Sequence, residues 1–340
     1  MKYTYQKKMP LVSMIVISAL FALFNYYTTT HSTVMGRDRI NYVANFIGYR
    51  PSPSKGLTFL MHMTHRFGGS IELLFYFTTF SCVFITLLAY RLSKKSTPYV
   101  FYLMCITQYF LTTLTALKQC YASAFAVLFF VLILEHDTKK SRIASLVCAI
   151  LACWFHPTGY ILFFMYFVVR IEKTAKNLRS YFLVLFIVGL FFEQIMLLFA
   201  SWISPFVPTL AWKILDYFGE SGVEVQDGIA ISFIKGVPYY FIACLGLFYR
   251  KIGKKCIKHY DEYLIVVGTG AFLFLISLYS AWLSRFVFFF GYTSFVFFGQ
   301  LMKITWKRIN RMACKFVVGG SLLVLTYRFL YLVYSLYGGF

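Results

Sequence analysis

Charged residues are scarce in this chain. Only 13% of its 340 residues carry a charge, and just 12 are acidic, whereas ordinary soluble domains are about 25% charged. Hydrophobic residues make up 60% of the sequence and recur in runs long enough to cross a bilayer core as a helix. Because these runs are continuous rather than alternating, a β-barrel is disfavoured. We therefore expect an all-α fold, a polytopic transmembrane helical bundle.

Common signatures of catalysis and cofactor binding are also missing. No GxSxG, Walker A, HExxH or Rossmann pattern occurs, and the eight cysteines have no metal-ligand spacing. His62 and His65 are three residues apart on an amphipathic stretch, but a metal there would need further ligands. We predict no cofactor and no metal. The first apolar run has spanning length and no small-residue cleavage site, so we expect a membrane helix rather than a signal peptide.

Lys and Arg residues are distributed unevenly along the chain. Most of the 33 fall in six clusters, one in every second loop between the apolar runs. The positive-inside rule then places the N-terminus in the cytoplasm. The net charge of +21 therefore reflects membrane topology rather than nucleic-acid binding.

The apolar runs and basic loops together predict about 11 spans in one membrane domain, residues 1–340. Outer segments cover about 31–69, including an amphipathic helix near 56–68, and about 204–228. The run 143–169 is flanked by basic loops, so it should fold as a pair of short helices broken near His156. The other helices are expected over about 11–30, 70–92, 98–116, 119–135, 181–203, 229–249, 263–283, 286–302 and 316–336.

Lys118 interrupts the apolar run 98–134. That run is too long for one span, so it should form a hairpin with Lys118 at its outer turn, near a helix N-terminus where the dipole is also positive. Such a spot favours an anion, although the side chain could instead extend to lipid headgroups. Arg285 lies in a predicted tight outer turn, and a guanidinium suits bidentate phosphate contact. Several outer cations at one depth indicate a pocket for phosphate or pyrophosphate.

Acid–base candidates are fewer. Glu193 and Arg328 fall at equal depth on two predicted helices, so they could form an interhelical ion pair, or Glu193 could face the cavity as a base. His156, in CWFHPTGY, could take a proton from a sugar hydroxyl. Alternatively it donates to a backbone carbonyl freed at the helix break.

Three stretches, in this order, resemble the EpsG-type, Wzy-like bacterial polysaccharide polymerases. GRDRINY is similar to their G-x-D-x-x-x-Y stretch, LKQCYA to R-Q-x-x-A, and FHPTGYI to H-x-(S/T). Ser284–Arg285 is similar to a late arginine of the same proteins. Lys118 departs from the usual arginine, which keeps the charge but loses the two-pronged geometry. The resemblance covers essentially the whole chain and points to Gly36, Asp38, Tyr42, Lys118, Gln119, His156 and Arg285.

The resemblance implies a GT-C-like fold and a glycosyltransferase that joins undecaprenyl-pyrophosphate-linked repeat units at the outer face of the bacterial inner membrane. A chain-length regulator and a flippase are expected partners, and fixed cations make a metal unnecessary. On this hypothesis Lys118 and Arg285 stabilise the departing pyrophosphate, and His156 or Glu193 activates the acceptor hydroxyl. Arg37 and Arg39 would assist capture of the donor. The substrate-binding set is Arg37, Asp38, Arg39, Tyr42, Gln119 and Arg328.

Two other classes remain open. A lipid-linked oligosaccharide flippase or other transporter would also need a cationic cavity, but transporters often show inverted repeats and charges in both leaflets. A membrane glycan acyltransferase would resemble proteins with a histidine inside the first helix, whereas His31 follows its predicted end. The sequence does not distinguish O-antigen, capsule and exopolysaccharide as the product.

Overall fold

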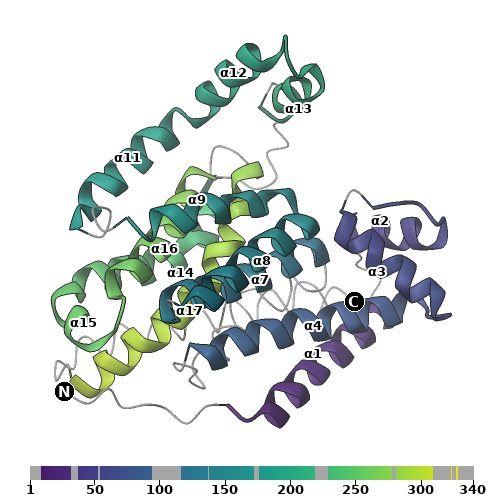
Figure 1. The fold of residues 1–340 in the computed structure, drawn as a ribbon, viewed down its shortest axis with the longest axis horizontal. Helices are drawn as coiled ribbons and strands as arrows, with labels where there is room; N and C mark the ends of the chain where they lie inside the picture. Colours follow the sequence, from purple (N-terminus) through teal and green to yellow (C-terminus); the bar gives the residue numbers. More distant parts are fainter. Residues whose placement is uncertain are drawn as a thin grey trace.

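The computed structural model describes residues 9–31, 37–52, 54–93, 116–136, 138–171, 176–218, 229–277 and 281–308, together with Leu323 and Tyr327. Within these residues the structure is helical and contains no β-strand (Figure 1). The predicted helix 98–116 lies almost wholly outside the described residues, as does 316–336 apart from the two isolated positions, and so does Arg328.

The first half of the bundle is built from four helices. Asn25 donates a side-chain hydrogen bond to Thr79, and Arg91 donates to the sulfur of Met14, so α1 and α4 are antiparallel. These helices and their partners are α1 (Leu11–His31), α4 (Ile71–Leu92), α7 (Leu117–Glu135) and α8 (Lys139–Phe155).

Helices α4 and α7 run in the same direction. The Tyr121 hydroxyl, in the second turn of α7, bonds Ser81 in the middle of α4, and the His136 ring bonds the carbonyl of Leu92 where both helices end (Nε2···O 3.1 Å). The end of α4 and the start of α7 therefore lie at opposite ends of the bundle. This geometry is what the predicted hairpin requires, and it places Lys118 in the first turn of α7, as expected.

The second half packs around α16. The Tyr239 and Phe274 rings stack 5.4 Å apart, and Tyr260 donates to the Gly246 carbonyl, so α14 is antiparallel to α16. The Phe297 ring, in the second half of α17, lies 5.1 Å from the ring of Tyr260 at the start of α16, so α17 is antiparallel to α16. These elements are η1 (Pro157–Tyr160), α9 (Ile161–Val168), α11 (Leu178–Leu190), α14 (Ile229–Phe248), α15 (Arg250–Cys256), α16 (Tyr260–Ile276) and α17 (Ala281–Arg308).

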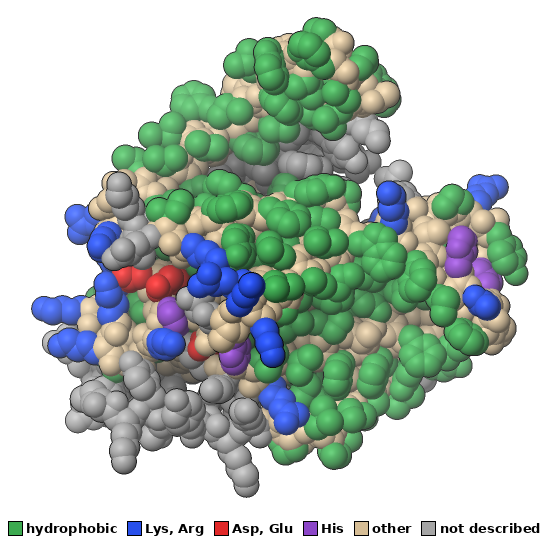
Figure 2. All heavy atoms as spheres, in the orientation of Figure 1, with side chains coloured by type: hydrophobic (Ala, Val, Ile, Leu, Met, Phe, Trp, Pro, Cys, Tyr) green, Lys and Arg blue, Asp and Glu red, His purple; other side chains and the backbone are tan. Residues whose placement is uncertain are grey.

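The bundle has two chemically different ends. One end, which we call the basic end, carries Arg91, Lys139, Lys140, Arg142, Arg250 and Lys254. The helices that end there are α4, α7, α14 and α17, and those that begin there are α8, α11 and α16. Figure 2 shows Lys and Arg side chains gathered there around α15, and a broad hydrophobic surface across the middle of the molecule. At the opposite end lie α2 (Arg37–Ile47) and α3 (Lys55–Arg66), with further Lys, Arg and His side chains (Figures 1 and 2).

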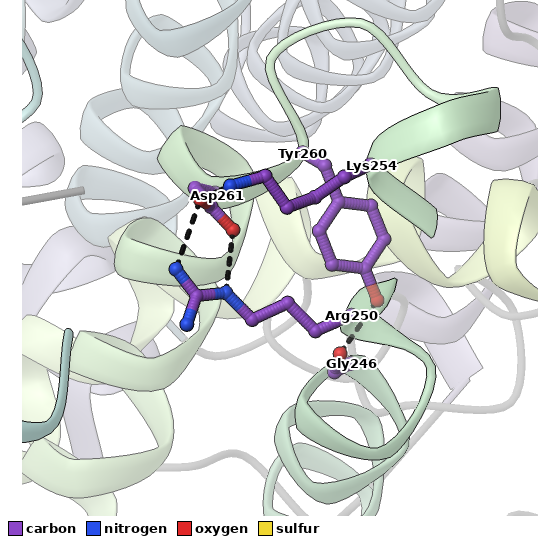
Figure 3. A network of polar contacts seen from close by, with 5 residues as sticks. All are labelled: Gly246, Arg250, Lys254, Tyr260 and Asp261. Atoms are coloured by element: carbon purple, nitrogen blue, oxygen red, sulfur yellow. Dashed lines mark hydrogen bonds and ion pairs between the residues drawn. The ribbon is translucent and has the colours of Figure 1, made fainter. Parts of the chain in front are cut away.

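Two partly exposed cations bind the buried carboxylate of Asp261 and fix the turn between α15 and α16 at the basic end (Figure 3). Arg250 contacts the Asp261 carboxylate through two N–H groups, at 2.8 and 3.0 Å, and the Lys254 ammonium lies 2.7 Å from the same carboxylate. Burial alone would raise the pKa of Asp261, but the hydrogen bonds and charges of Arg250 and Lys254 outweigh it and hold the pKa below its ordinary value.

Two helices among the described residues are long and apolar enough to cross a membrane by themselves, α4 and α7. A third span arises if α11 and α12 (Phe192–Ile203) are taken together, although they meet at an angle of 65°. Shorter apolar stretches occur in α1, α14 and α17 and at η1 with α9. The apolar spans and the apolar outer surface are those of a helical membrane protein.

Several predicted boundaries are wrong. The expected continuous helix 181–203 is instead two helices, which meet at Phe191. Gly189, a weak helix former, lies just before the break. Glu193 lies just after it, in the first turn of α12, where the free backbone N–H groups favour a carboxylate. The outer segments are helical: α2 lies in the first, and α13 (Pro208–Phe218), which begins at a proline, in the second. The amphipathic helix near 56–68 is confirmed as α3.

Arg285 does not lie in a turn. It is the fifth residue of α17, which begins at Ala281 rather than near 286. The stretch AWLSRFVFFF contains neither Gly nor Pro, so nothing in it ends or delays the helix. The helices α12 and α13 form a separate arm that projects away from the bundle in Figure 1, with a small core of Ala200, Ile203, Ala211 and Ile214.

Candidate functional site

A small apolar cluster holds α2 and α3 against the starts of α4 and α7. This arrangement brings the segment with α2 and α3 onto the helix that carries Lys118, although the two are far apart in sequence. We call this region the site end of the bundle. The cluster consists of Tyr42, Phe46, Leu57, Met61, Leu74, Phe75 and Leu117.

Lys118 lies over the ring of Tyr42. Its Nζ atom is 5.5 Å from the ring centroid, a distance at which the electron-rich face of the ring attracts the ammonium. Lys118 is half-buried in the first turn of α7, next to the positive end of the helix dipole, and Gln119 beside it is buried. The structure thus brings Tyr42 beside Lys118, although the two sequence motifs are more than 70 positions apart.

Arg39 makes a matching contact one helical turn before Tyr42. Its guanidinium carbon lies 4.8 Å from the centroid of the Phe75 ring on α4, and the side chain is only 4% exposed. Because Arg39 and Tyr42 are three residues apart on α2, both face the bundle. Two cations therefore lie within one interface, each beside an aromatic ring supplied by another helix.

His156 is tied to this interface through Phe155. The Phe155 ring stacks on Tyr121 of α7 with centroids 4.2 Å apart, one turn after Lys118. A side chain at Gly56, in the first turn of α3, would lie 2.8 Å from the Phe155 ring, so glycine lets α3 approach closely. The first turn of α3 and the end of α8 are therefore in contact. His156 follows directly, at the predicted break.

The chain reverses after His156. Gly159 lies so close to α8 that a Cβ there would be 2.6 Å from the Cys153 nitrogen and 2.7 Å from the Ala152 carbonyl carbon. Nδ1 of His156 is 2.6 Å from the Thr158 hydroxyl oxygen and accepts the Thr158 backbone N–H at 3.3 Å. The predicted pair of short helices is confirmed as α8 followed by η1 and α9.

Arg285 lies in the part of α17 nearer the site end. The Phe130 ring of α7 contacts Phe290, and Tyr263, bonded to Glu135 at the end of α7, stacks on Phe297. Helices α7 and α17 therefore run in the same direction, and α17 begins toward the end where α7 begins. Helix α17 also contacts η1. The structure describes the backbone of Arg285 but not its side chain.

Of the remaining predicted residues, Glu193 lies away from this cluster, and the side chains of the others are not among the described parts of the structure. Glu193 is exposed on α12, which stands away from α2 and α3 in Figure 1. Its predicted partner Arg328 lies outside the described residues. Arg37 and Asp38 form the first turn of α2, and only their backbone is described.

His62 and His65 differ sharply in their surroundings. The His65 ring stacks on Phe46 and Tyr49, with centroids 3.9 and 4.2 Å away, and its Nε2 donates to the Phe46 carbonyl. His62 is exposed. The two histidines therefore have different tasks: His65 holds α3 to the end of α2, whereas His62 does not. No group of three or more His, Cys, Asp or Glu suited to a metal occurs among the residues described.

Sequence reasoning missed three residues that shape the site. Thr158 was visible as the third residue of HPT, but only the structure shows its contact with His156. Phe75 and Phe155 are two of 40 phenylalanines, and no local pattern distinguishes them from the rest. Their contacts depend on which helices pack together.

Comparisons with known proteins gave one match. The sequence model of the EpsG family matches residues 9–338, nearly the whole chain. Neither the curated proteins nor the solved structures contain a match to this chain.

Proposed function

Because the chain belongs to the EpsG family, we propose that it is a polysaccharide polymerase that joins undecaprenyl-pyrophosphate-linked glycan repeat units. The observation that carries this proposal is the convergence of Lys118, Tyr42 and Arg39 at the end of the bundle opposite the basic loops. By the positive-inside rule the basic end is cytoplasmic. The cationic interface then faces the outer side of the bacterial inner membrane, and the N-terminus is cytoplasmic.

The chemistry fits an anionic lipid donor. An acceptor hydroxyl attacks the sugar carbon bonded to pyrophosphate, the new glycosidic C–O bond forms, and the electron pair of the broken C–O bond leaves with the pyrophosphate. Lys118 and Arg285 stabilise the charge that develops on this leaving group. Since fixed cations neutralise that charge, the reaction is metal-independent.

Arg39 has a different task from the capture role that its position in GRDRINY indicates. Its guanidinium is buried against Phe75, so it acts as a fixed positive charge within the α2–α4 interface. Tyr42 holds the Lys118 ammonium at this interface. Gln119 lies beside Lys118 and belongs to the same donor-binding region, as do Arg37 and Asp38 at the start of α2.

The full architecture that we propose is a GT-C-like bundle of about 11 spans. The alternating directions of α1, α4, α11, α14, α16 and α17 support this topology. We also propose that a flippase delivers the donor to the outer face and that a chain-length regulator acts on the product.

Glycan length on cells tests the function. A strain without its own copy is complemented with wild type, Lys118→Ala, Arg285→Ala or the control Lys251→Ala, which removes an exposed cation from the basic end. Membrane levels are checked by immunoblot. We expect long chains with wild type and the control, and single repeat units with the two site variants. Normal chain length in both site variants would contradict the proposed site.

The flippase alternative predicts another outcome of the same experiment. Loss of a flippase removes even the single repeat unit from the cell surface, because no donor reaches the outer side. Loss of a polymerase leaves that single unit in place. The presence or absence of single units at the surface therefore separates the two functions.

A further inference from the structure

The contacts of His156 determine which ring nitrogen carries its proton. We propose that Thr158 is a positioning residue that holds His156 with the proton on Nε2, so that His156 donates a hydrogen bond to the pyrophosphate of the donor lipid. This inference rests on the proposed function for the identity of the substrate, but its structural part stands on the contacts of Thr158 alone.

Two contacts at Nδ1 fix the tautomer. The Thr158 backbone N–H points at Nδ1 from 3.3 Å and can only donate. A proton on Nδ1 would therefore set two donors against each other, and the neutral ring keeps its proton on Nε2. The Thr158 hydroxyl, 2.6 Å from Nδ1, then donates its own proton to the same nitrogen.

The surroundings keep Thr158 and the ring in this arrangement. Thr158 is only 4% exposed, and Gly159 packs directly on the backbone of α8, so the turn has little freedom to rotate. The side chain of His156 also caps η1 by accepting the Thr158 N–H. Turning the ring to free Nδ1 would cost both hydrogen bonds at once.

This arrangement changes the expected role of His156. A general base must accept a proton at a nitrogen that has a lone pair available, and the Nδ1 lone pair is taken up by Thr158. The Nε2–H group instead suits a pyrophosphate oxygen, whose negative charge grows as the sugar–oxygen bond breaks. The proton of the attacking hydroxyl passes to a pyrophosphate oxygen of the leaving group, so the balance needs no protein base.

Substitution of His156 separates a donor from a base. The Gln amide nitrogen can occupy the place of Nε2 and donate there, whereas the Asn amide nitrogen is closer to the place of Nδ1, and neither can accept a proton as a base. We expect His156→Gln to give longer glycans than His156→Asn or His156→Ala. Equal loss in all three variants, by about 10²–10⁴-fold as for removal of a general base, would overturn the donor role.

The tautomer itself is measured by nitrogen NMR of the full chain with ¹⁵N-labelled histidine in lipid nanodiscs. The signal missing from His156→Gln identifies His156 among the six histidines. We expect the Nε2–H tautomer in wild type and Thr158→Ser, and a mixture with the Nδ1–H tautomer in Thr158→Val. The control Thr293→Val removes a buried hydroxyl bonded within α17 and should leave the signal unchanged.

The outcomes distinguish this inference from the proposed function. An Nδ1–H tautomer in wild type would overturn the positioning role even if Lys118→Ala and Arg285→Ala abolish polymerisation. Conversely, the NMR measurement needs no substrate, so it decides the role of Thr158 even if those two variants polymerise normally. A Thr158→Val spectrum identical to wild type would show that the hydroxyl is not needed.

Discussion

The Lys118 ammonium lies 5.5 Å from the centroid of the Tyr42 ring. This contact joins the start of α7 to α2. The contact does more than link two sequence motifs. It holds a cation, which would otherwise extend freely into water or headgroups, at a defined place beside the N-terminus of α7. We regard this pairing as the core of the candidate site.

The Tyr42 ring should matter more than its hydroxyl. Tyr42→Phe keeps the face over which Lys118 lies, and we expect glycans close to wild-type length. Tyr42→Leu keeps apolar volume but removes the ring, and it should weaken the Lys118 contact by about 0.5–2 kcal/mol and shorten the chains. Glycan length and thermal unfolding in detergent measure the two effects. If Phe and Leu behave alike, the ring face has no special role.

Gly159 should tolerate no side chain. A Cβ there would meet backbone atoms of α8 at 2.6–2.7 Å, and backbone cannot move aside without bending the helix. Overpacking typically costs about 1–3 kcal/mol, and we expect Gly159→Ala to lower the free energy of unfolding by at least this amount. Gly56→Ala is the comparison: its Cβ would meet only the Phe155 ring at 2.8 Å, and a ring can shift. Similar membrane levels and melting temperatures for wild type and Gly159→Ala would contradict the close approach.

The two histidines of α3 should differ in their effect on stability. His65→Ala removes two ring stacks and a hydrogen bond, so we expect α2 and α3 to loosen, with a loss of about 1–3 kcal/mol. His62→Ala changes an exposed side chain and should be neutral. Protease sensitivity of the first outer segment measures this difference. Equal protease sensitivity in the two variants would show that the His65 ring stack does not stabilise the contact between α2 and α3.

The Asp261 ion pair should give the protein a pH-dependent stability. The pKa of Asp261 is lowered in the folded state, so its contribution is complete above the unfolded pKa of about 3.9 and is lost as pH falls through the lower folded value. At pH 7 we expect Asp261→Asn to cost about 1–3 kcal/mol. The difference from wild type should shrink toward zero as pH falls through the lowered pKa of Asp261 in the folded state.

A matched control for this pair is Glu262→Gln, next in the chain. Glu262 faces His259 at 3.6 Å and is 31% exposed, so its loss should cost less than that of Asp261. Thermal unfolding of the detergent-solubilised protein across a pH series compares the two. A difference between wild type and Asp261→Asn that stays constant with pH would contradict the ion-pair account.

Sequence patterns predicted the helices whose ends are marked by charge or by a break. Apolar length and basic loops located α1, α4 and α7 nearly to the residue, and the proline after His156 located the turn between α8 and η1. The break at Phe191 was not predictable in the same way, because the apolar run continues through it and no proline marks it. Helix α2 was missed since its polar sequence carries no spanning signal.

The candidate site was predictable in part. Lys118, Tyr42 and His156 were singled out from motifs and local charge, and the structure brings them to one end. Their aromatic partners could not be foreseen, because Phe75 and Phe155 owe their roles to helix packing rather than to sequence neighbours. Glu193 shows the opposite failure: its depth along a straight helix indicated a buried partner, but the bend at Phe191 takes α12 away from the bundle.

The most direct test of the account is polymerisation by the purified protein. Lipid-linked single repeat units, extracted from the producing strain lacking this protein, are placed in liposomes with wild type, Lys118→Ala or the control Lys251→Ala. We predict that wild type and the control convert the single units to a ladder of longer glycans while Lys118→Ala does not. If wild type leaves every unit single, or Lys118→Ala forms the same ladder, the account is wrong.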